Sequence, residues 1–348
     1  MPHQSPNIFI TYKFKKHVLG GDVYERMVVE GLSGAFDVLP HAIVSGGGSL
    51  GSVFKSPALA WRLARASSAA SQRCPVGIFS ADAFLLPFRF PRAVIGIVHH
   101  VGGSSNAFFA AFEKKMFTRL QRAHCLVVVS EYWSQYFSAL GFKNLELIYN
   151  GFAVSDYEIS RYATDDFKAR YGLTGKPIIY LGNCGPLKGV QRTRAALRGI
   201  DAHFVSSGRG GKASEDVMSL RLDRRDYLRL LAASDVITTM SEFDEGWCRT
   251  AHEGMLTRTP VIGSGRGGMR ELLVGGKQVI TEDPRELREA VLAYLKDPNK
   301  RAAVGQQGFD YAATFTFERF QAAWRGCVDR AIRAQFTELP AVPAPSFI

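Results

Sequence analysis

The 348-residue chain has few cysteines, and their arrangement excludes two common kinds of stabilising site. There are five of them, an odd number, and no two form a Cys-x-x-Cys pair. Structural zinc sites use such pairs, and small secreted proteins are cross-linked by even sets of cysteines. We therefore expect no metal site and no disulfide framework, which favours a reducing, cytoplasmic location.

Long apolar segments are also missing. No run approaches the 18 apolar residues that a transmembrane helix needs, and the first residues, MPHQSPNIFITYKFKKH, lack the apolar core of a signal peptide. There are no short repeats and no long low-complexity segment. These absences predict a globular protein that neither crosses a membrane nor is exported.

The charge is positive but is not concentrated. Lys and Arg number 43 against 32 Asp and Glu, and the net charge of +11 is spread over both halves. No stretch interleaves basic and aromatic residues as nucleic-acid-binding motifs do, so we expect no nucleic acid partner. A diffuse positive charge suits a phosphorylated substrate or an anionic membrane surface.

The chain has an ordinary globular composition, 46% hydrophobic and 22% charged, and a length that suits two domains. Its first half predicts strands at 8–12, 36–39, 76–79, 93–98, 125–129 and 145–149 and helices at 23–31, 57–71, 106–122 and 131–140. Its second half predicts strands at 177–181, 203–205, 236–240, 260–262 and 278–280 and helices at 190–198, 225–233, 249–256, 269–274 and 285–296. Strand and helix alternate in both halves, which indicates an α/β fold of two Rossmann-like domains with parallel sheets facing a central cleft.

The domain boundary is predicted after the Asn150-Gly151 turn, in the weakly patterned stretch 152–163. Two further helical patterns follow, at 301–312 and 317–335. We divide the chain into an N-terminal domain (1–155), a C-terminal domain (156–315), a helix that packs back across both (316–338) and a frayed tail with three prolines (339–348).

The segment with the most suggestive chemistry follows a buried strand of the second half. Its acidic loop includes Glu245, and the helix that begins near Cys248 carries Glu253 about two turns further on. Ligands bind at this end of strands in open α/β sheets, and the free N–H groups of a helix start favour an anion. Carboxylates accept hydrogen bonds from hydroxyl groups, so this pair predicts a cradle for a sugar nucleotide. The next loop, 263–268, is glycine-rich, and its backbone could approach a ligand closely.

This stretch resembles the E-x(7)-E signature of family 4 glycosyltransferases, the retaining enzymes of GT-B fold among the glycosyl transferases of group 1. The family pattern is matched in order and spacing by Glu245, Gly246, the aromatic Trp247, Glu253, Met255, Pro260, Val261, Ile262, Gly267, Gly268 and Glu271. Shorter motifs at 20–26, 128–131, 148–151 and 182–189 also resemble family motifs. The resemblance covers residues 7–335.

The resemblance implies a retaining, metal-independent hexosyltransferase without a cofactor, whose donor substrate is a nucleotide-diphosphate sugar such as a UDP- or GDP-sugar. Lys188 would neutralise the diphosphate and assist departure of the nucleotide, Glu253 would hold the ribose hydroxyls, and Glu245 would contact the hexose. No side chain stands out as a nucleophile, and Glu245 is one candidate. The first domain would bind the acceptor, a glycan or a lipid-linked saccharide of cell-surface polysaccharide assembly. Its Gly20–Gly21 loop would lie near the donor phosphates.

The other positions of these motifs assigned to donor binding are Asn183, Gly246, Trp247, Cys248 and Arg249. Arg209 is added because it follows a predicted strand and could reach the nucleotide. Three of the motif positions depart from the family pattern. Asn183 stands where the family has an arginine, which removes a positive charge from the diphosphate site, and Cys248 replaces a glycine. Arg249 replaces an apolar residue, and we hypothesise that it supplies the missing charge.

A histidine doublet, His99 and His100, closes the strand 93–98. In the family a histidine at this strand end faces the cleft, where it contacts the donor sugar or assists the reaction. Neighbours on an extended segment alternate in direction, so one of the two is expected to point inward, and position favours His99. An imidazole can transfer protons at neutral pH. His252, beside Glu253, is expected to be structural or exposed.

Two questions stay open at this stage. The helix Ala107–Arg122 has an aromatic face and a basic edge, which fits a core helix or a surface that lies on the anionic inner face of a membrane. The departures Asn183 and Cys248 also fit a catalytically inactive scaffold that binds nucleotide sugars. Another activity of the same fold, such as an epimerase or a phosphorylase, is a further alternative.

Overall fold

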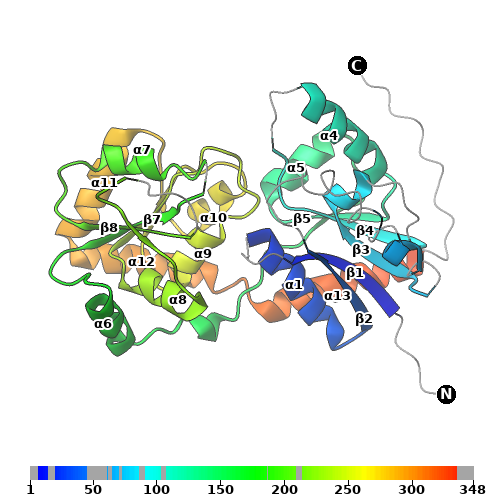
Figure 1. The fold of residues 1–348 in the computed structure, drawn as a ribbon, viewed down its shortest axis with the longest axis horizontal. Coiled ribbons are helices and arrows are strands. Elements are labelled where there is room, and N and C mark those ends of the chain that lie inside the picture. Colours follow the sequence, from blue (N-terminus) through cyan, green and yellow to red (C-terminus); the bar gives the residue numbers. More distant parts are fainter. Residues whose placement is uncertain are drawn as a thin grey trace.

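The computed structural model describes residues 7–14, 20–44, 61, 65–69, 73–85, 91–102, 107–185, 187–208 and 214–334. Within these residues there are two six-stranded sheets, each entirely parallel and each covered by helices, as the sequence predicts (Figure 1). No helix in the described part of the chain is long and apolar enough to cross a membrane.

The first sheet has the strand order β2-β1-β3-β4-β5-β6. Its central strands are apolar and buried along their whole length, as expected for parallel strands covered on both faces. The strands are β1 (Asn7–Phe14), β2 (Asp37–Val44), β3 (Val76–Ser80), β4 (Ala93–Val98), β5 (Cys125–Val128) and β6 (Leu145–Leu147). The helices of this half are α1 (Gly20–Ser33), α4 (Ala107–Leu120), α5 (Glu131–Ala139) and the 3-10 helix η1 (Ala81–Leu85).

The second sheet has the order β12-β11-β10-β7-β8-β9. Its strands are β7 (Ile178–Asn183), β8 (His203–Ser207), β9 (Met218–Leu220), β10 (Val236–Thr239), β11 (Val261–Gly263) and β12 (Val279–Ile280). Around it lie η2 (Val154–Tyr157), α6 (Arg161–Arg170), α7 (Val190–Ala196), α8 (Arg224–Ala233), α9 (Arg249–Leu256), α10 (Met269–Gly275), α11 (Pro284–Lys296) and α12 (Pro298–Ala312).

The last described helix, α13 (Phe317–Ala334), returns from the second half to the first, where it packs on α1, β3 and β4 (Figure 1). Its Trp324 is fully buried and donates a hydrogen bond to the hydroxyl of Tyr24, which in turn donates to the carbonyl of Ile148. The chain therefore crosses between the halves twice. The two crossings run side by side, because Phe152 donates its N–H to Phe315 and accepts one from Phe317.

Two elements of the second half were missed by the sequence patterns. The helix α6 occupies part of the stretch that seemed weakly patterned, and β9 adds an edge strand. The strand β9 has only three residues and lies mostly exposed at the sheet edge, and in α6 only Thr164 and Phe167 are buried. Of the helix predicted at 57–71, only Trp61 and residues 65–69 lie within the described residues, and the tail 339–348 lies outside them.

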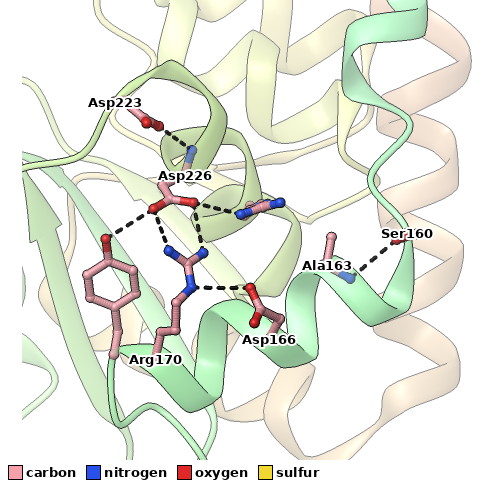
Figure 2. Close-up of polar contacts among 8 residues, drawn as sticks. Ser160, Ala163, Asp166, Arg170, Asp223 and Asp226 are labelled. Atoms are coloured by element: carbon pink, nitrogen blue, oxygen red, sulfur yellow. Dashed lines mark hydrogen bonds and ion pairs between the residues drawn. The ribbon is translucent and has the colours of Figure 1, made fainter.

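A carboxylate at the centre of a polar cluster holds α6 against α8 (Figure 2). Both oxygens of Asp226 accept hydrogen bonds from Arg170, at 3.0 and 3.1 Å, and Asp226 also accepts from Arg229 and Tyr171. The hydrogen bonds from Arg170 are the main reason that the pKa of Asp226 is lowered from 3.8 to about 2. Tertiary contacts of this kind explain why α6 forms despite its weak apolar pattern.

We expect Asp226→Asn to lower the free energy of unfolding by about 1–2 kcal/mol, allowing for screening of the partly exposed Arg170 by water. The pKa of the carboxyl group is lowered in the folded state, so its contribution is complete at neutral pH. It is lost as the pH falls from about 4 through about 2. Urea unfolding at pH 7 measures the effect. Asp165→Asn, which removes an exposed ion pair on the same helix, is the matched control and should change stability by less than about 0.5 kcal/mol. Equal effects of the two variants would contradict this role for Asp226.

Candidate functional site

The strands of both sheets end at the boundary between the two halves, and most of the predicted site residues lie there. His99 and His100 follow β4. Lys188 lies in the loop after β7, and Glu245 lies between β10 and α9. This is the edge of a parallel sheet where ligands bind in open α/β folds.

Glu245 is buried and firmly held. Its Oε1 atom accepts hydrogen bonds from Lys188 Nζ and from the hydroxyl of Ser241, both at 2.5 Å. Its backbone carbonyl accepts a hydrogen bond from the indole N–H of Trp133, which comes from α5 of the other half. The backbone of Glu245 also forms a β-bridge with Gly267. The carboxylate is thus neutralised by Lys188 and fixed by contacts from both halves.

The loop that carries Lys188 is shaped by two left-handed residues, Leu187 and Gly189. A methyl group on Gly189 would overlap the carbonyl oxygen of Met240, so only glycine allows this close packing on the end of β10. Asn183 helps to form the loop, because its side-chain oxygen accepts the N–H of Gly185 at 2.9 Å. The Lys188 ammonium group lies 4.7 Å from the centre of the Phe243 ring, a second favourable contact for its charge.

Glu253 forms a second buried cluster. One of its oxygens, Oε1, accepts hydrogen bonds from Tyr157 and Arg249 and forms a 2.9 Å ion pair with Arg224. Burial, together with the charge of Glu253, raises the pKa of Tyr157. Its hydroxyl therefore stays protonated at neutral pH. Because all three contacts reach the same oxygen, they leave the other oxygen of Glu253 for a further donor.

Arg249 bridges the two halves. Besides Glu253 it donates to the side-chain oxygen of Asn150 at 2.9 Å, and its guanidinium lies 4.4 Å from the centre of the Phe152 ring. The aliphatic part of Arg249 lies beside Gly20 at the start of α1. The structure therefore brings Arg249 to Glu253 and to the first half; its contact with a diphosphate stays a prediction.

The first half contributes His99, His100 and the start of α1. His99 Nε2 lies 3.6 Å from a carboxylate oxygen of Glu25, and the His99 ring packs closely on Gly21. The ring of His100 lies 5.6 Å from that of Phe243 in the other half, so both histidines reach the boundary. The expected Gly20–Gly21 loop needs a correction, because both residues belong to the first turn of α1, whose free N–H groups they provide.

Three neighbouring predicted residues pack inside the protein. A methyl group on Gly246 would overlap the carbonyl oxygen of His99, so this glycine allows the two halves to meet. The ring of Trp247 is buried against Tyr149. Cys248 is buried, and burial raises the pKa of its thiol to about 12, which keeps it neutral and unreactive. Arg209, also predicted to bind the donor, lies outside the described residues.

His252 is a buried structural residue. Its Nδ1 accepts a hydrogen bond from the indole N–H of Trp247, so Nε2 carries the proton that it donates to the carbonyl of Ala312. Burial lowers the pKa of His252 to about 3, and the ring is therefore neutral. It stacks on Phe152 at 3.9 Å, beside the crossing segments.

The glycine-rich loop 263–268 packs closely on other parts of the chain at three of its glycines, and its approach to a ligand stays a prediction. Gly265 packs on Ile280, Gly267 packs on the backbone of Glu245, and Gly268 packs on the backbone of Gly246 and on Ser130. Close approach is indeed what these glycines provide, but the partners are other parts of the chain.

Glu271, which the sequence singled out only as part of the family pattern, connects the two halves. Glu271 accepts the backbone N–H of Glu131 at the start of α5, at 2.9 Å, and the hydroxyl of Tyr149 at 3.1 Å. Burial raises the pKa of Glu271 to about 7, although these hydrogen bonds act in the opposite direction. No sequence signal distinguishes Glu271 or Trp133 as contacts between the halves, because each partner lies more than 100 residues away.

Stability should therefore depend on pH through Glu271. Its pKa is raised in the folded state, from 4.5 to about 7, so the folded protein holds a proton that the unfolded chain has lost. The free energy of unfolding should fall as the pH rises from 4.5 to 7, by about 1–2 kcal/mol after allowance for partial exposure. Glu271→Gln should abolish this slope in melting temperatures, whereas the exposed control Glu289→Gln should keep it. The same slope in both variants would exclude Glu271 as its source.

The described residues contain no cluster of three or more His, Cys, Asp or Glu side chains that could hold a metal ion. All five cysteines are free. The polar groups around Lys188, Glu245 and Glu253 can instead bind a ligand with hydroxyl groups at its ends and anionic groups in its middle.

Part of the sequence is similar to known glycosyltransferases. Residues 217–310 match the model of the family described as "Glycosyl transferases group 1". An uncharacterized glycosyltransferase of Methanocaldococcus jannaschii is 25% identical over 155 residues, which are 40% of this chain and 44% of that protein. The matches thus span less than half the length of the curated relatives.

Solved structures define the fold class. Anabaena HepE, in complex with UDP and glucose, superposes with a TM-score of 0.77 at 15% identity, over 93% of this chain and all of that chain. Sucrose-phosphate synthase from Thermosynechococcus elongatus gives 0.78 at 17% identity, over 94% of this chain and 99% of that one. At these identities the similarity shows the fold alone, which is the GT-B fold of glycosyltransferases.

Proposed function

We propose that the protein is a retaining, metal-independent glycosyltransferase of family 4. It would move a hexose from a UDP- or GDP-sugar to a glycan or lipid-linked acceptor in cell-surface polysaccharide assembly. One observation carries the proposal. The buried Glu245 is paired with Lys188 at the ends of the strands that face His99, and Glu253, also buried, lies on the helix α9 that follows. HepE, a neighbour in fold, was solved with UDP and with glucose, which supports a nucleotide sugar as donor.

The roles follow from charge and position. Lys188 would exchange its contact with Glu245 for the diphosphate, joined by the N–H groups at the starts of α1 and α9. The free oxygen of Glu253 would accept a ribose hydroxyl, and Glu245 would hold the hexose. These cationic and dipolar groups would take the place of a metal ion at the leaving group.

In the proposed reaction the bond between C1 of the hexose and the β-phosphate oxygen breaks. The oxygen of the acceptor hydroxyl then bonds to C1 on the same face, and its proton passes to the departing phosphate. His99 stands at the end of β4, where an imidazole could contact the hexose or shuttle that proton. Lys188 would stabilise the charge that develops on the diphosphate.

Calorimetric titration with UDP, GDP, UDP-glucose and GDP-mannose tests the donor site. We expect one base to bind, and Glu253→Ala and Lys188→Ala to weaken that binding at least tenfold. Glu289→Ala and Lys296→Ala, at exposed positions, are the matched controls. Absence of binding for every nucleotide would contradict the proposal, and binding without hydrolysis or transfer would favour an inactive scaffold. Reaction with phosphate and a glucan alone would indicate a phosphorylase, and interconversion of two nucleotide sugars would indicate an epimerase.

Retention is tested separately by following the released hexose with proton NMR during slow donor hydrolysis. The first product should carry the anomeric configuration of the donor, because water would attack on the face that the nucleotide leaves. Initial release of the opposite anomer would exclude a retaining mechanism.

We also propose that the protein works in the cytoplasm at the inner face of the membrane. The support is the basic edge of α4, where Lys114 and Lys115 are exposed; the side chains of 107–113 lie outside the described residues. Anionic liposomes should bind the wild type, and a Lys114→Glu/Lys115→Glu variant should bind less. Failure of the wild type to bind would remove this part of the proposal.

A further inference from the structure

A cavity lies between the two halves, apart from the cluster around Lys188. Its volume is about 780 Å³, which is within the range of small-molecule sites. One wall is the start of α5, and the other is formed by the loop after β11, by α10 and by the segment after β12. Figure 1 shows α5 and α10 on the facing sides of the two halves.

The charge of the cavity indicates what it can hold. Four carboxyl groups line it, from Glu131, Asp244, Glu271 and Glu282. They face only two guanidinium groups, and one of these, that of Arg266, is already paired with Glu282. Glu271, with a pKa of about 7, is only partly ionised at neutral pH, so the excess negative charge comes mainly from Glu131 and Asp244 against Arg270. This small negative charge disfavours a nucleotide or a lipid diphosphate. The lining suits a neutral ligand rich in hydroxyl groups, which can donate to the carboxylates.

The apolar part of the lining fits the same ligand. Tyr132 is 38% exposed at the rim, and Tyr136, one turn further along α5, is 37% exposed. Val274 is 59% exposed on the opposite wall. Tyrosine rings combine a flat apolar face with a polar edge, as the stacking of a sugar ring requires. Tyr132 and Val274, on opposite walls, could therefore pack on the two faces of a sugar ring.

Several polar groups of the lining are available to a ligand. Among the described residues, no hydrogen bond or ion pair engages the side chains of Glu131, Gln135 or Arg270. All three are exposed, and each can reach a hydroxyl group without breaking an existing contact.

The cavity is also connected to the candidate site. The hydroxyl of Tyr132 donates to Asp244 at 2.9 Å, and Asp244 directly precedes Glu245. The hydroxyl of Ser264, another lining residue, donates to the carbonyl of Ser241, whose side chain holds the Glu245 carboxylate. A ligand in the cavity would touch the two segments that position Glu245.

We propose that this cavity binds a neutral saccharide, namely the acceptor glycan or its distal part. The assignment as acceptor rests on the proposed function. The proposal that a saccharide binds in the cavity does not rest on the proposed function, because this binding needs no nucleotide sugar and can be measured without one.

Saturation-transfer NMR on the full chain tests the proposal with a panel of neutral disaccharides: maltose, cellobiose, lactose, mannobiose and chitobiose. We expect at least one of them to bind the wild type, with or without UDP. Tyr132→Ala, which removes the stacking ring, and Val274→Trp, which fills the cavity, should each raise its Kd at least tenfold. Tyr162→Ala, at an exposed tyrosine on α6, is the matched control and should bind normally.

The outcomes separate this proposal from the proposed function. Unchanged saccharide binding in both cavity variants, or no binding of any disaccharide to the wild type, would overturn the saccharide site and leave the donor site intact. Loss of binding in the two cavity variants alone would support the site even if calorimetry finds no binding of UDP-glucose.

Discussion

Replacing Lys188 with alanine should lower the turnover number at saturating donor about a hundred- to a thousandfold. Lys188 is the cation that contacts the buried Glu245 carboxylate, at the sheet edge where the leaving diphosphate would lie. Removal of one preorganised donor from a developing negative charge costs roughly this factor. Steady-state hydrolysis of the preferred nucleotide sugar gives the measurement.

The same substitution leaves Glu245 buried with only the hydroxyl of Ser241 as a side-chain partner, which also destabilises the fold. The double variant Lys188→Ala/Glu245→Gln removes this unpaired charge and should recover stability but not turnover. Lys296→Ala should behave as the wild type. Turnover within threefold of the wild type in Lys188→Ala would contradict a role at the leaving group.

Gly246→Ala should reduce kcat/KM at least a hundredfold and should also lower the melting temperature, because the core shared by the two halves would be opened. The added methyl group would overlap the carbonyl oxygen of His99 across the boundary between the halves. Because both groups belong to the backbone, the overlap is relieved only if the halves separate. Each half has its own sheet, and its secondary structure should remain, although one apolar core continues from the first half into the second.

Small-angle scattering should show a larger radius of gyration for Gly246→Ala than for the wild type. Gly102→Ala is the matched control, since a methyl group on Gly102 meets no atom within 4 Å. A variant with normal kcat/KM and normal dimensions would show that the halves do not need this contact.

The alternating strand and helix patterns sufficed to predict both sheets, because buried parallel strands are apolar along their whole length. They did not predict the edge strand β9, nor α6, half of whose residues are charged and whose stability depends on the contact between Arg170 and Asp226. Local sequence carries no signal for a partner 56 residues away.

The E-x(7)-E motif predicted Glu245 and Glu253 as neighbours because their spacing belongs to one loop and one helix, and the separate motif at 182–189 pointed to Lys188. Such a motif could not show which contacts its glycines make. It could not distinguish a glycine that meets a ligand from one that meets another segment, since both positions demand the absence of a side chain. Gly268 shows the second case, in which the partner is Ser130 of the other half. The contacts of Trp133 and Glu271 between the halves were not predicted, because such contacts leave no local pattern in the sequence.

The paired crossings of the chain have a mechanical consequence. Phe152 is hydrogen-bonded to both Phe315 and Phe317, so the two covalent tethers act as one narrow hinge. Bending about this hinge keeps the two hydrogen bonds, whereas twisting one half against the other would shear them apart. Opening about this hinge would separate Gly246 from His99 and Glu271 from α5, and closing would bring each pair together again.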